Sequence, residues 1–327
     1  MAQAESQQIL IENQPDGSPT FSILVEAENL STTEISKLHD SLDTLAAQGD
    51  SLKTADAVLL IDSGQLTDET RKELNRRYPW LTIRRVDAAV SYGGMKGRSA
   101  GLVTSDVIVL SDSDCRYQPD WLRQILAPFQ NHPDVHIVGG ETTTPIHGPY
   151  SLAIALTFVF PRFSGGQTIA PSRTYWANNV AVRRVLLESM PVPDPRQLYR
   201  GQNIVHSQAA SAAGYTIWRQ PRARALHALP LPAEYSRRYY RMGRDSVHIA
   251  RLARDESGQS YRGDMEPDCQ TGGRFHKLAG RLRLIRAENP RALWSLPLAL
   301  PVLFLGALCY YAGRLTASLT ASPAPTN

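Results

Sequence analysis

Two aspartates, Asp112 and Asp114, stand at the end of a β-branched apolar run at residues 107–110. A run that ends abruptly in carboxylates is typical of a buried strand that emerges at the carboxyl edge of a parallel sheet, where α/β proteins bind their ligands. Residues i and i+2 of an extended chain point to the same side, so both carboxylates can face one hard divalent cation. A cation held there would neutralise a diphosphate. The alternative is an Asp-rich turn that only ends the strand.

Glycines and basic side chains precede this strand at residues 91–98, Ser-Tyr-Gly-Gly-Met-Lys-Gly-Arg. Glycine permits a close approach of the backbone to a ligand, and the Lys96 ammonium is a point charge suited to phosphate. The run lacks the spacing of a Walker loop, so it does not by itself indicate a P-loop nucleotide site.

Alternating strand and helix patterns surround these residues and predict an α/β, doubly wound sheet. Polar groups follow the early strands, as they would at a ligand-binding edge. One apolar piece, residues 152–160, fits either a buried helix or a helix that grazes a membrane. The predicted strands cover residues 21–25, 57–61, 81–83, 107–112, 135–138 and 215–218, and regular structure is expected to resume at 178–182. The predicted helices cover 34–48, 67–78, 122–129 and 205–213, with a short one around 100–102.

The composition is that of a globular chain, with 42% hydrophobic and 20% charged residues among 327, enough for one large domain or two ordinary ones. The net charge of +4 belongs to one segment, because residues 1–234 carry 21 Lys/Arg against 24 Asp/Glu, whereas residues 235–291 carry 13 against 7. This distribution argues against nucleic acid as a partner. The cysteines are too far apart for a zinc knuckle or a disulfide framework, and the first residues lack the features of a secretory signal.

Residues 292–313 are uncharged and lie between Arg291 and Arg314. A bilayer core needs about 20 apolar residues in a helix, so this stretch predicts a transmembrane helix that leaves a short tail at 314–327. A buried C-terminal helix and a monotopic anchor are the alternatives. Residues 234–291 form a basic, helical, membrane-proximal region. By the positive-inside rule we expect a single-pass protein of the cell membrane whose catalytic part is cytoplasmic.

Further short patterns follow one another along the chain in a fixed order, besides the Asp-Ser-Asp. They are Glu28-Asn29, Ile61-Asp62-Ser63-Gly64, the run 92–101, Trp176-Ala177-Asn178-Asn179, Gly201-Gln202-Asn203, Ala213-Gly214-Tyr215, Pro221, Ala223, Ala225 and His227. Together these residues resemble the family-2 glycosyltransferases, and the resemblance covers about residues 20–230. It implies a GT-A fold, a Rossmann-like and mostly parallel sheet with flanking helices, at 20–233. The polar residues 1–19 before it predict a flexible lead-in.

The resemblance implies a nucleotide-diphospho-sugar donor and Mg²⁺ or Mn²⁺. Asp114 would bind the metal directly, and His227 would approach the diphosphate or metal unless it is an ordinary histidine at a strand end. Carried over by position, Ala27, Glu28 and Asp62 would line the nucleoside pocket, Lys96 would lie near ribose or phosphate, and Asp112 would hold ribose and a metal-bound water.

The chain departs from the family at Gln202-Asn203, where the usual pair is Glu-Asp and the aspartate is the general base. An amide cannot accept the proton of the acceptor. Asp194, between two prolines that restrict its backbone, and His206 are candidates to replace it. Another explanation is an acceptor that needs little deprotonation, and a third is a catalytically silent nucleotide-sugar-binding protein.

We therefore predict a membrane-anchored glycosyltransferase with an unidentified acceptor, which the apolar C-terminal stretch and its preceding arginines suggest is lipid-linked. These arginines could instead only fix the topology. A nucleotidyltransferase on a similar sheet is a further alternative, and it would release pyrophosphate from a nucleoside triphosphate.

Overall fold

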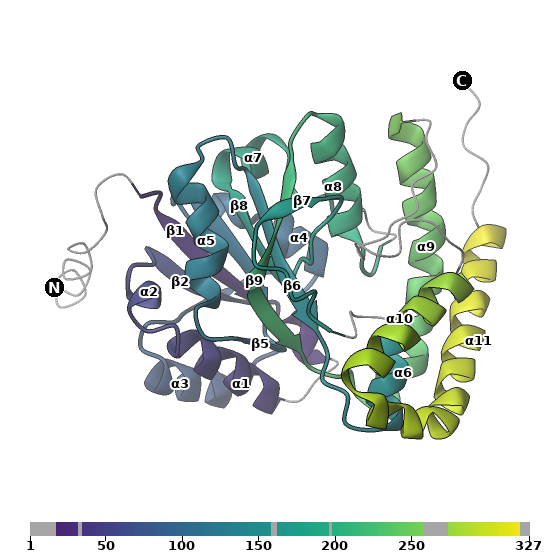
Figure 1. Cartoon of the computed structure of the whole chain (residues 1–327). Coiled ribbons are helices and arrows are strands. Elements are labelled where there is room, and N and C mark those ends of the chain that lie inside the picture. Colours follow the sequence, from purple (N-terminus) through teal and green to yellow (C-terminus); the bar gives the residue numbers. More distant parts are fainter. Residues whose placement is uncertain (1–17, 32–34, 158–161, 196–197, 258–273, 321–327) are drawn as a thin grey trace, which may run out of the picture.

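A computed structural model describes residues 18–31, 35–157, 162–195, 198–257 and 274–320. A single large sheet runs through the N-terminal two thirds of the chain, and a group of helices lies at one side of it (Figure 1). The strands of the described part are β1 (Phe21–Glu26), β2 (Ala57–Asp62), β3 (Thr82–Arg85), β4 (Val107–Asp112), β5 (Cys115–Tyr117), β6 (Ile137–Thr143), β7 (Ala170–Ser172), β8 (Asn179–Arg183) and β9 (Ile217–His227).

The sheet is mixed, with the order β3-β2-β1-β4-β8-β6-β9-β5 and with β7 paired to β9. The half from β3 to β4 is parallel, as the strand and helix alternation predicts. Beyond β4 the sheet differs from the mostly parallel expectation, because β8 runs antiparallel to both β4 and β6. The carboxyl ends of β1 and β4 meet in register, with Glu26 beside Asp112. This edge is where the candidate site lies.

Both faces of the sheet are covered, which explains the continuous apolar runs in its central strands. Ile23 and Val109 face a core that α1 and α5 complete, whereas Leu24 and Ile108 face a second core on the side of α4, α7 and α8. The α-helices are α1 (Ile35–Ala46), α2 (Asp50–Lys53), α3 (Asp68–Arg77), α4 (Tyr92–Gly97), α5 (Trp121–Asn131), α6 (Pro149–Thr157), α7 (Arg184–Ser189), α8 (Gln202–Ala212), α9 (Tyr235–Ser257), α10 (Arg274–Glu288) and α11 (Leu296–Thr320), with 3-10 turns η1 (Glu28–Ser31), η2 (Ser99–Gly101), η3 (Pro232–Glu234) and η4 (Pro290–Ser295).

Two local elements differ from the sequence patterns. The glycine-rich run is itself a helix, α4, because the Ser91 hydroxyl accepts the N–H of Gly94 and caps its first turn. The strand expected at 215–218 continues through Pro221 to the end of β9. This proline is tolerated because the ladder with β6 is interrupted there: pairing stops at Arg219 and resumes at Arg224.

The helices α6, α9, α10 and α11 pack together beside the sheet (Figure 1). Residues 151–156 of α6 are buried, so the described part of the apolar piece at 152–160 is a buried helix, and its last residues lie outside the described part. The lead-in at 1–19 also lies almost wholly outside it.

The apolar C-terminal stretch is helical, as expected, although its ends differ from 292–313. Residues 290–295 form η4, and α11 continues past Arg314 to Thr320, so the tail begins later than 314. The stretch Pro290–Thr320 is long and apolar enough to cross a membrane by length and composition, and its most apolar 18 residues have a mean hydropathy of 2.0. Only 17% of this 18-residue part is buried, whereas the core helix of a soluble protein is mostly buried.

Candidate functional site

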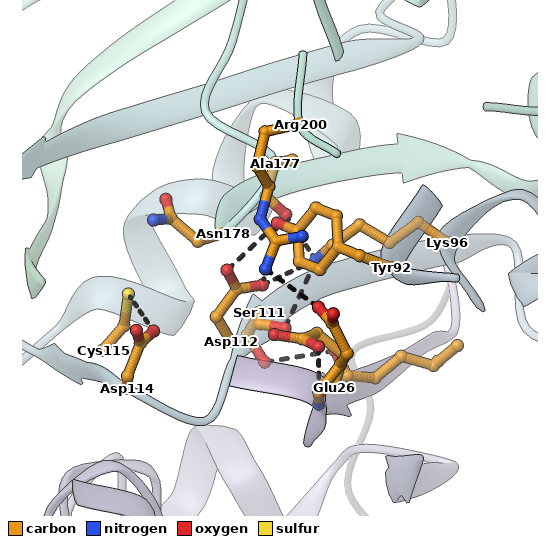
Figure 2. Close-up of polar contacts among 12 residues, drawn as sticks. Glu26, Tyr92, Lys96, Ser111, Asp112, Asp114, Cys115, Ala177, Asn178 and Arg200 are labelled. Carbon is orange, nitrogen blue, oxygen red and sulfur yellow. Dashed lines mark hydrogen bonds and ion pairs between the residues drawn. The ribbon is translucent and has the colours of Figure 1, made fainter. Parts of the chain in front are cut away.

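The carboxylate of Asp112 lies at the end of β4 and is held by two side chains from α4. Its Oδ1 is 2.7 Å from the Lys96 ammonium, and the Tyr92 hydroxyl donates to its Oδ2 at 3.0 Å (Figure 2). Lys96 and Asp112 are both almost fully buried. Lys96 also donates to the carbonyl of Ala177 at 2.7 Å, so this lysine joins β4 to the loop before β8. The basic run, expected near ribose or phosphate, is therefore in direct contact with the Asp-Ser-Asp through Lys96 and Asp112.

Glu26 lies beside Asp112 and is one of the polar groups that end the first strand, although the resemblance assigns it no role. Burial raises the pKa of its carboxyl well above the ordinary value, and the neighbouring charge of Asp112 raises it further. Its Oε2 accepts the N–H of Glu28, whereas its Oε1 has no hydrogen-bond partner among the described residues. Two adjacent polar residues at the ends of adjacent parallel strands are the signal that could have identified it.

Asp114 turns away from Asp112 toward the end of β9. Its Oδ2 is 3.6 Å from Nε2 of His227, and the oxygens and nitrogens of this pair form a potential metal-binding group with the Cys115 thiol, within 4.8 Å of one another. Figure 2 shows Asp112 and Asp114 on different sides of their strand end, each with its own neighbours. The expectation that both carboxylates face one ion from the same side is thus not what the side chains show.

The donor atoms of this group fit a divalent cation. The Asp114 carboxylate and the His227 imidazole are both buried, and the 3.6 Å between them is too long for a good hydrogen bond. Two ligand atoms at this separation can bind the same ion. Burial raises the pKa of the Cys115 thiol well above its usual value, so the neutral sulfur is a poor ligand for Mg²⁺ or Mn²⁺. Asp114 and His227 are accordingly the residues that would hold the metal, with Asp112 next to them.

Arg200 and Asp245 form a second polar cluster that the sequence patterns missed. The Arg200 guanidinium pairs with Glu28 at 2.8 Å and stacks over the ring of Tyr92 with 4.1 Å between its Cζ and the ring centroid. The two oxygens of Asp245, on α9, accept the backbone N–H groups of Tyr199 and Arg200 at 2.9 Å each. Burial raises the pKa of Asp245 to about 6, and the hydrogen bonds to the two N–H groups oppose this rise. Only the packing of α9 against the loop at 198–201 brings this carboxylate to the site.

A cavity of about 360 Å³ connects these groups. Its lining includes two carboxylates, Asp112 and Asp245. Arg200, Asn203, His227 and Tyr310 of α11 line it as well. A smaller cavity of about 230 Å³ lies on the other side of His227 and is lined by Asp114 and Lys37. His227 therefore stands between the two spaces.

The residues expected in the nucleoside pocket lie at the carboxyl ends of β1 and β2. Asp62 is fully buried, its Oδ1 accepts the N–H groups of Gly64, Gln65 and Leu66, and its Oδ2 pairs with Arg71 at 2.9 Å. The N–H of Ala27 donates to the Ile61 carbonyl. In the described structure Asp62 thus has a structural role, and the backbone at Ala27 is held to β2.

The candidates for the general base occupy three different places. The Nδ2 of Asn203 donates to the Tyr175 carbonyl at 2.6 Å at the edge of the cavity. His206 is buried between the Tyr175 hydroxyl and the Met190 carbonyl, and burial lowers its pKa, so it is neutral with both ring nitrogens engaged. Asp194 accepts a hydrogen bond from Ser91 at the start of α4 and is not among the residues that line the cavity.

Comparison with known proteins agrees with this geometry. Residues 32–164 match the model of glycosyl transferase family 2. The structure resembles that of the mannosyltransferase PcManGT from Pyrobaculum calidifontis in complex with GDP-Man and Mn²⁺, with a TM-score of 0.56, 16% identity and coverage of 96% of this chain and 93% of that one. It also resembles GalNAc-T7 with UDP, GalNAc and Mn²⁺, with a TM-score of 0.56, 11% identity and coverage of 86% of this chain and 58% of that one.

A short segment is also similar to the glucosyl-dolichyl phosphate glucuronosyltransferase of Haloferax volcanii, with 37% identity over 51 residues, which is 16% of each chain. The structural similarities, at such low identity, show a shared fold. The strand-end aspartates, the order of the sheet and the family match together show that residues 32–164 are a glycosyl transferase family 2 region and that the chain has the GT-A fold.

Proposed function

We propose that the protein transfers a sugar from a nucleotide-diphospho-sugar to an acceptor hydroxyl in a metal-dependent reaction. The observation that carries this proposal is the place of the Asp114–His227 pair: His227 borders both cavities, Asp114 lines the smaller one and Asp112 lines the larger one. One of the similar structures contains GDP-Man and Mn²⁺, and the other contains UDP, GalNAc and Mn²⁺, which supports the donor class.

The proposed reaction is attack of the acceptor hydroxyl on the anomeric carbon, with the nucleoside diphosphate as leaving group. A metal held by Asp114 and His227 would supply positive charge for that diphosphate. In the chain itself, Lys96 holds Asp112 in place, and the Arg200 guanidinium adds a cation on the cavity wall where negative charge develops. Asp112 and Glu28 are proposed to hold the donor, and Ala27 and Asp62 to shape the nucleoside side.

Asp245 is the proposed proton acceptor. Of the two carboxylates that line the main cavity, Asp112 is already paired with Lys96. A pKa of about 6 leaves Asp245 ionised at neutral pH and close to the range in which a general base is effective. The sequence candidate Asp194 is a weaker proposal, because it is exposed and bonded to Ser91.

The acceptor is proposed to be a lipid-linked molecule, and the protein a membrane protein whose catalytic domain faces the cytoplasm. Tyr310 of the apolar helix α11 lines the same cavity as Asp112, so this helix borders the space proposed for the acceptor. The name of the Haloferax volcanii relative, which includes dolichyl phosphate, is in keeping with such a substrate.

A catalytically silent donor-binding protein is the second candidate, and the Asn203 amide in the usual base position favours it. Purified full-length protein would be incubated with a panel of UDP- and GDP-sugars, Mn²⁺ and polyprenyl phosphates. We expect release of nucleoside diphosphate coupled to a labelled lipid product. Metal-dependent donor binding with neither transfer nor slow hydrolysis would contradict the enzyme and support the silent protein.

A further inference from the structure

The helix α11 has a packed face and an exposed apolar face. The packed face is made of small residues: Ala299, Gly306, Gly313 and Ala317 are buried. The opposite face exposes large apolar side chains at helical spacing from the preceding turn to the last turn. These are Trp294 (83% exposed), Leu298, Leu300, Phe304 (73%), Leu305, Leu308, Tyr311, Leu315 and Leu319 (76%), which we call the apolar stripe.

The packed face lies against α9, and the two helices run side by side in the same direction (Figure 1). Near the start of α9, the Tyr235 hydroxyl donates to the Val302 carbonyl at 2.8 Å. About three turns further along both helices, Arg314 donates to the Ser246 hydroxyl at 3.2 Å. The middle of α11 therefore lies beside the first half of α9.

That half of α9 is highly charged, with Arg237, Arg238, Arg241, Arg244 and Asp245 within nine residues. If α11 crossed a bilayer in this packing, it would carry these residues to the depth of the hydrocarbon core, where charged side chains are costly and Arg237 and Arg244 are exposed. A spanning arrangement would bury the apolar stripe of α11 in hydrocarbon, but it would bury the charges of α9 there as well.

The helix α9 also cannot separate from α11 and remain outside the membrane. A Cβ added at Gly243 or at Gly313 would overlap the backbone carbonyl of Tyr310 or of Tyr240, so the two backbones are in direct contact. On its other side α9 holds the catalytic domain through Asp245, which accepts the N–H of Tyr199. The helix α11 is therefore one wall of the globular protein, with a single face open.

We propose that α11 lies in the plane of a membrane surface and inserts the apolar stripe into one leaflet, so that the protein is monotopic. The occupant of the stripe is an anionic lipid bilayer. Charge complementarity selects it, because exposed arginines lie on α11 and on the two elements that pack with its first half: Arg283 and Arg286 on α10, Arg291 on η4 and Arg314 on α11. In this orientation the packed face of α11, with Tyr310, borders the cavity from the membrane side.

The first test measures binding of the full-length protein to preformed vesicles by flotation, without donor or acceptor, so that its outcome is independent of the proposed transferase activity. The vesicles contain phosphatidylcholine with or without phosphatidylglycerol. We expect the protein to bind to the outer leaflet of these vesicles, more strongly when phosphatidylglycerol is present and more weakly at high salt. The double variant Phe304→Gln/Leu308→Gln should bind at least about tenfold more weakly. Val185→Gln, on α7 and 55% exposed, is the matched control that should bind as the parent does.

The second test measures the depth of three labels along the stripe. Leu298→Cys, Leu308→Cys and Leu319→Cys would each carry an NBD group in a background with Cys269→Ser and Cys309→Ala, since Cys115 is fully buried. If α11 lies in the plane of the membrane, quenching by brominated lipids should place all three NBD groups at the same shallow depth. A central label at the bilayer midplane with the end labels near opposite surfaces would overturn the proposal, as would a stable dimer that binds neither vesicle.

Discussion

The Lys96 ammonium lies 2.7 Å from the Asp112 carboxylate, and both side chains are 3% exposed. Removing one partner of a buried ion pair leaves a buried charge unpaired, so Lys96→Met should lower the free energy of unfolding by about 3–5 kcal/mol. The double variant Lys96→Met/Asp112→Asn should recover part of that loss. Urea denaturation measures both. Lys53→Met is the control, because the Lys53–Asp50 pair is exposed and should contribute little; an equal loss in both variants would contradict the account.

Asp245 should control the pH dependence of turnover. A base must be deprotonated, so kcat/KM should rise with pH through about 6 and level off above it, in line with the raised pKa of this carboxyl. Asp245→Asn should lower kcat by a factor of about 10²–10⁴ and remove this acidic limb from the residual activity. Asp194→Asn should stay within a few-fold of the parent. An intact acidic limb in Asp245→Asn, or a large loss in Asp194→Asn, would show that another group is the base.

Asn203→Asp restores the residue that the family usually has, yet the structure predicts no gain. The Asn203 amide donates to the Tyr175 carbonyl at 2.6 Å, and a carboxylate there would face that oxygen with no hydrogen to donate. The free energy of unfolding should fall by about 1–3 kcal/mol, and turnover should not increase. Thermal unfolding and steady-state kinetics of Asn203→Asp beside Asn203→Ala measure this. A large gain in turnover would mean that the parent is base-deficient.

The contact between α9 and α11 should depend on its glycines. Gly313→Ala places a methyl group against the Tyr240 carbonyl, so the helices must move apart, at a cost of about 1–3 kcal/mol. Gly148→Ala is the matched control, because a Cβ added there meets nothing within 4 Å. Denaturant unfolding in detergent compares the two. Equal stability of both variants would argue against this close packing.

The parallel half of the sheet could be predicted because its strands are buried on both faces and read as continuous apolar runs. The three-residue strands β5 and β7 are too short to give a periodic signal, and β9 passes through Pro221 only because its ladder with β6 is interrupted there. These features depend on the partner strand, which a local pattern does not specify.

The candidate site, like the sheet, could be predicted from the sequence only in part. Asp112, Asp114 and Lys96 are visible as charged residues at the ends of apolar or glycine-rich runs, and they do gather at one edge of the sheet. Arg200 and Asp245 were not predictable, because α9 reaches the site only through tertiary packing. The apolar length of 292–313 likewise indicated a membrane helix but could not show that charged α9 lies beside it.

The central claim is metal-dependent sugar transfer, and the most direct measurement is the rate of nucleoside diphosphate release by Asp114→Asn and by the parent, each in Mn²⁺ and in EDTA. Because Asp114 is proposed to bind the metal and its substitution removes one full negative charge, the parent should lose activity in EDTA, and Asp114→Asn in Mn²⁺ should be at least about tenfold slower than the parent in Mn²⁺. Asp120→Asn, an exposed aspartate paired with Arg123, should behave as the parent does. Equal metal-dependent release by Asp114→Asn and the parent would contradict the proposed site.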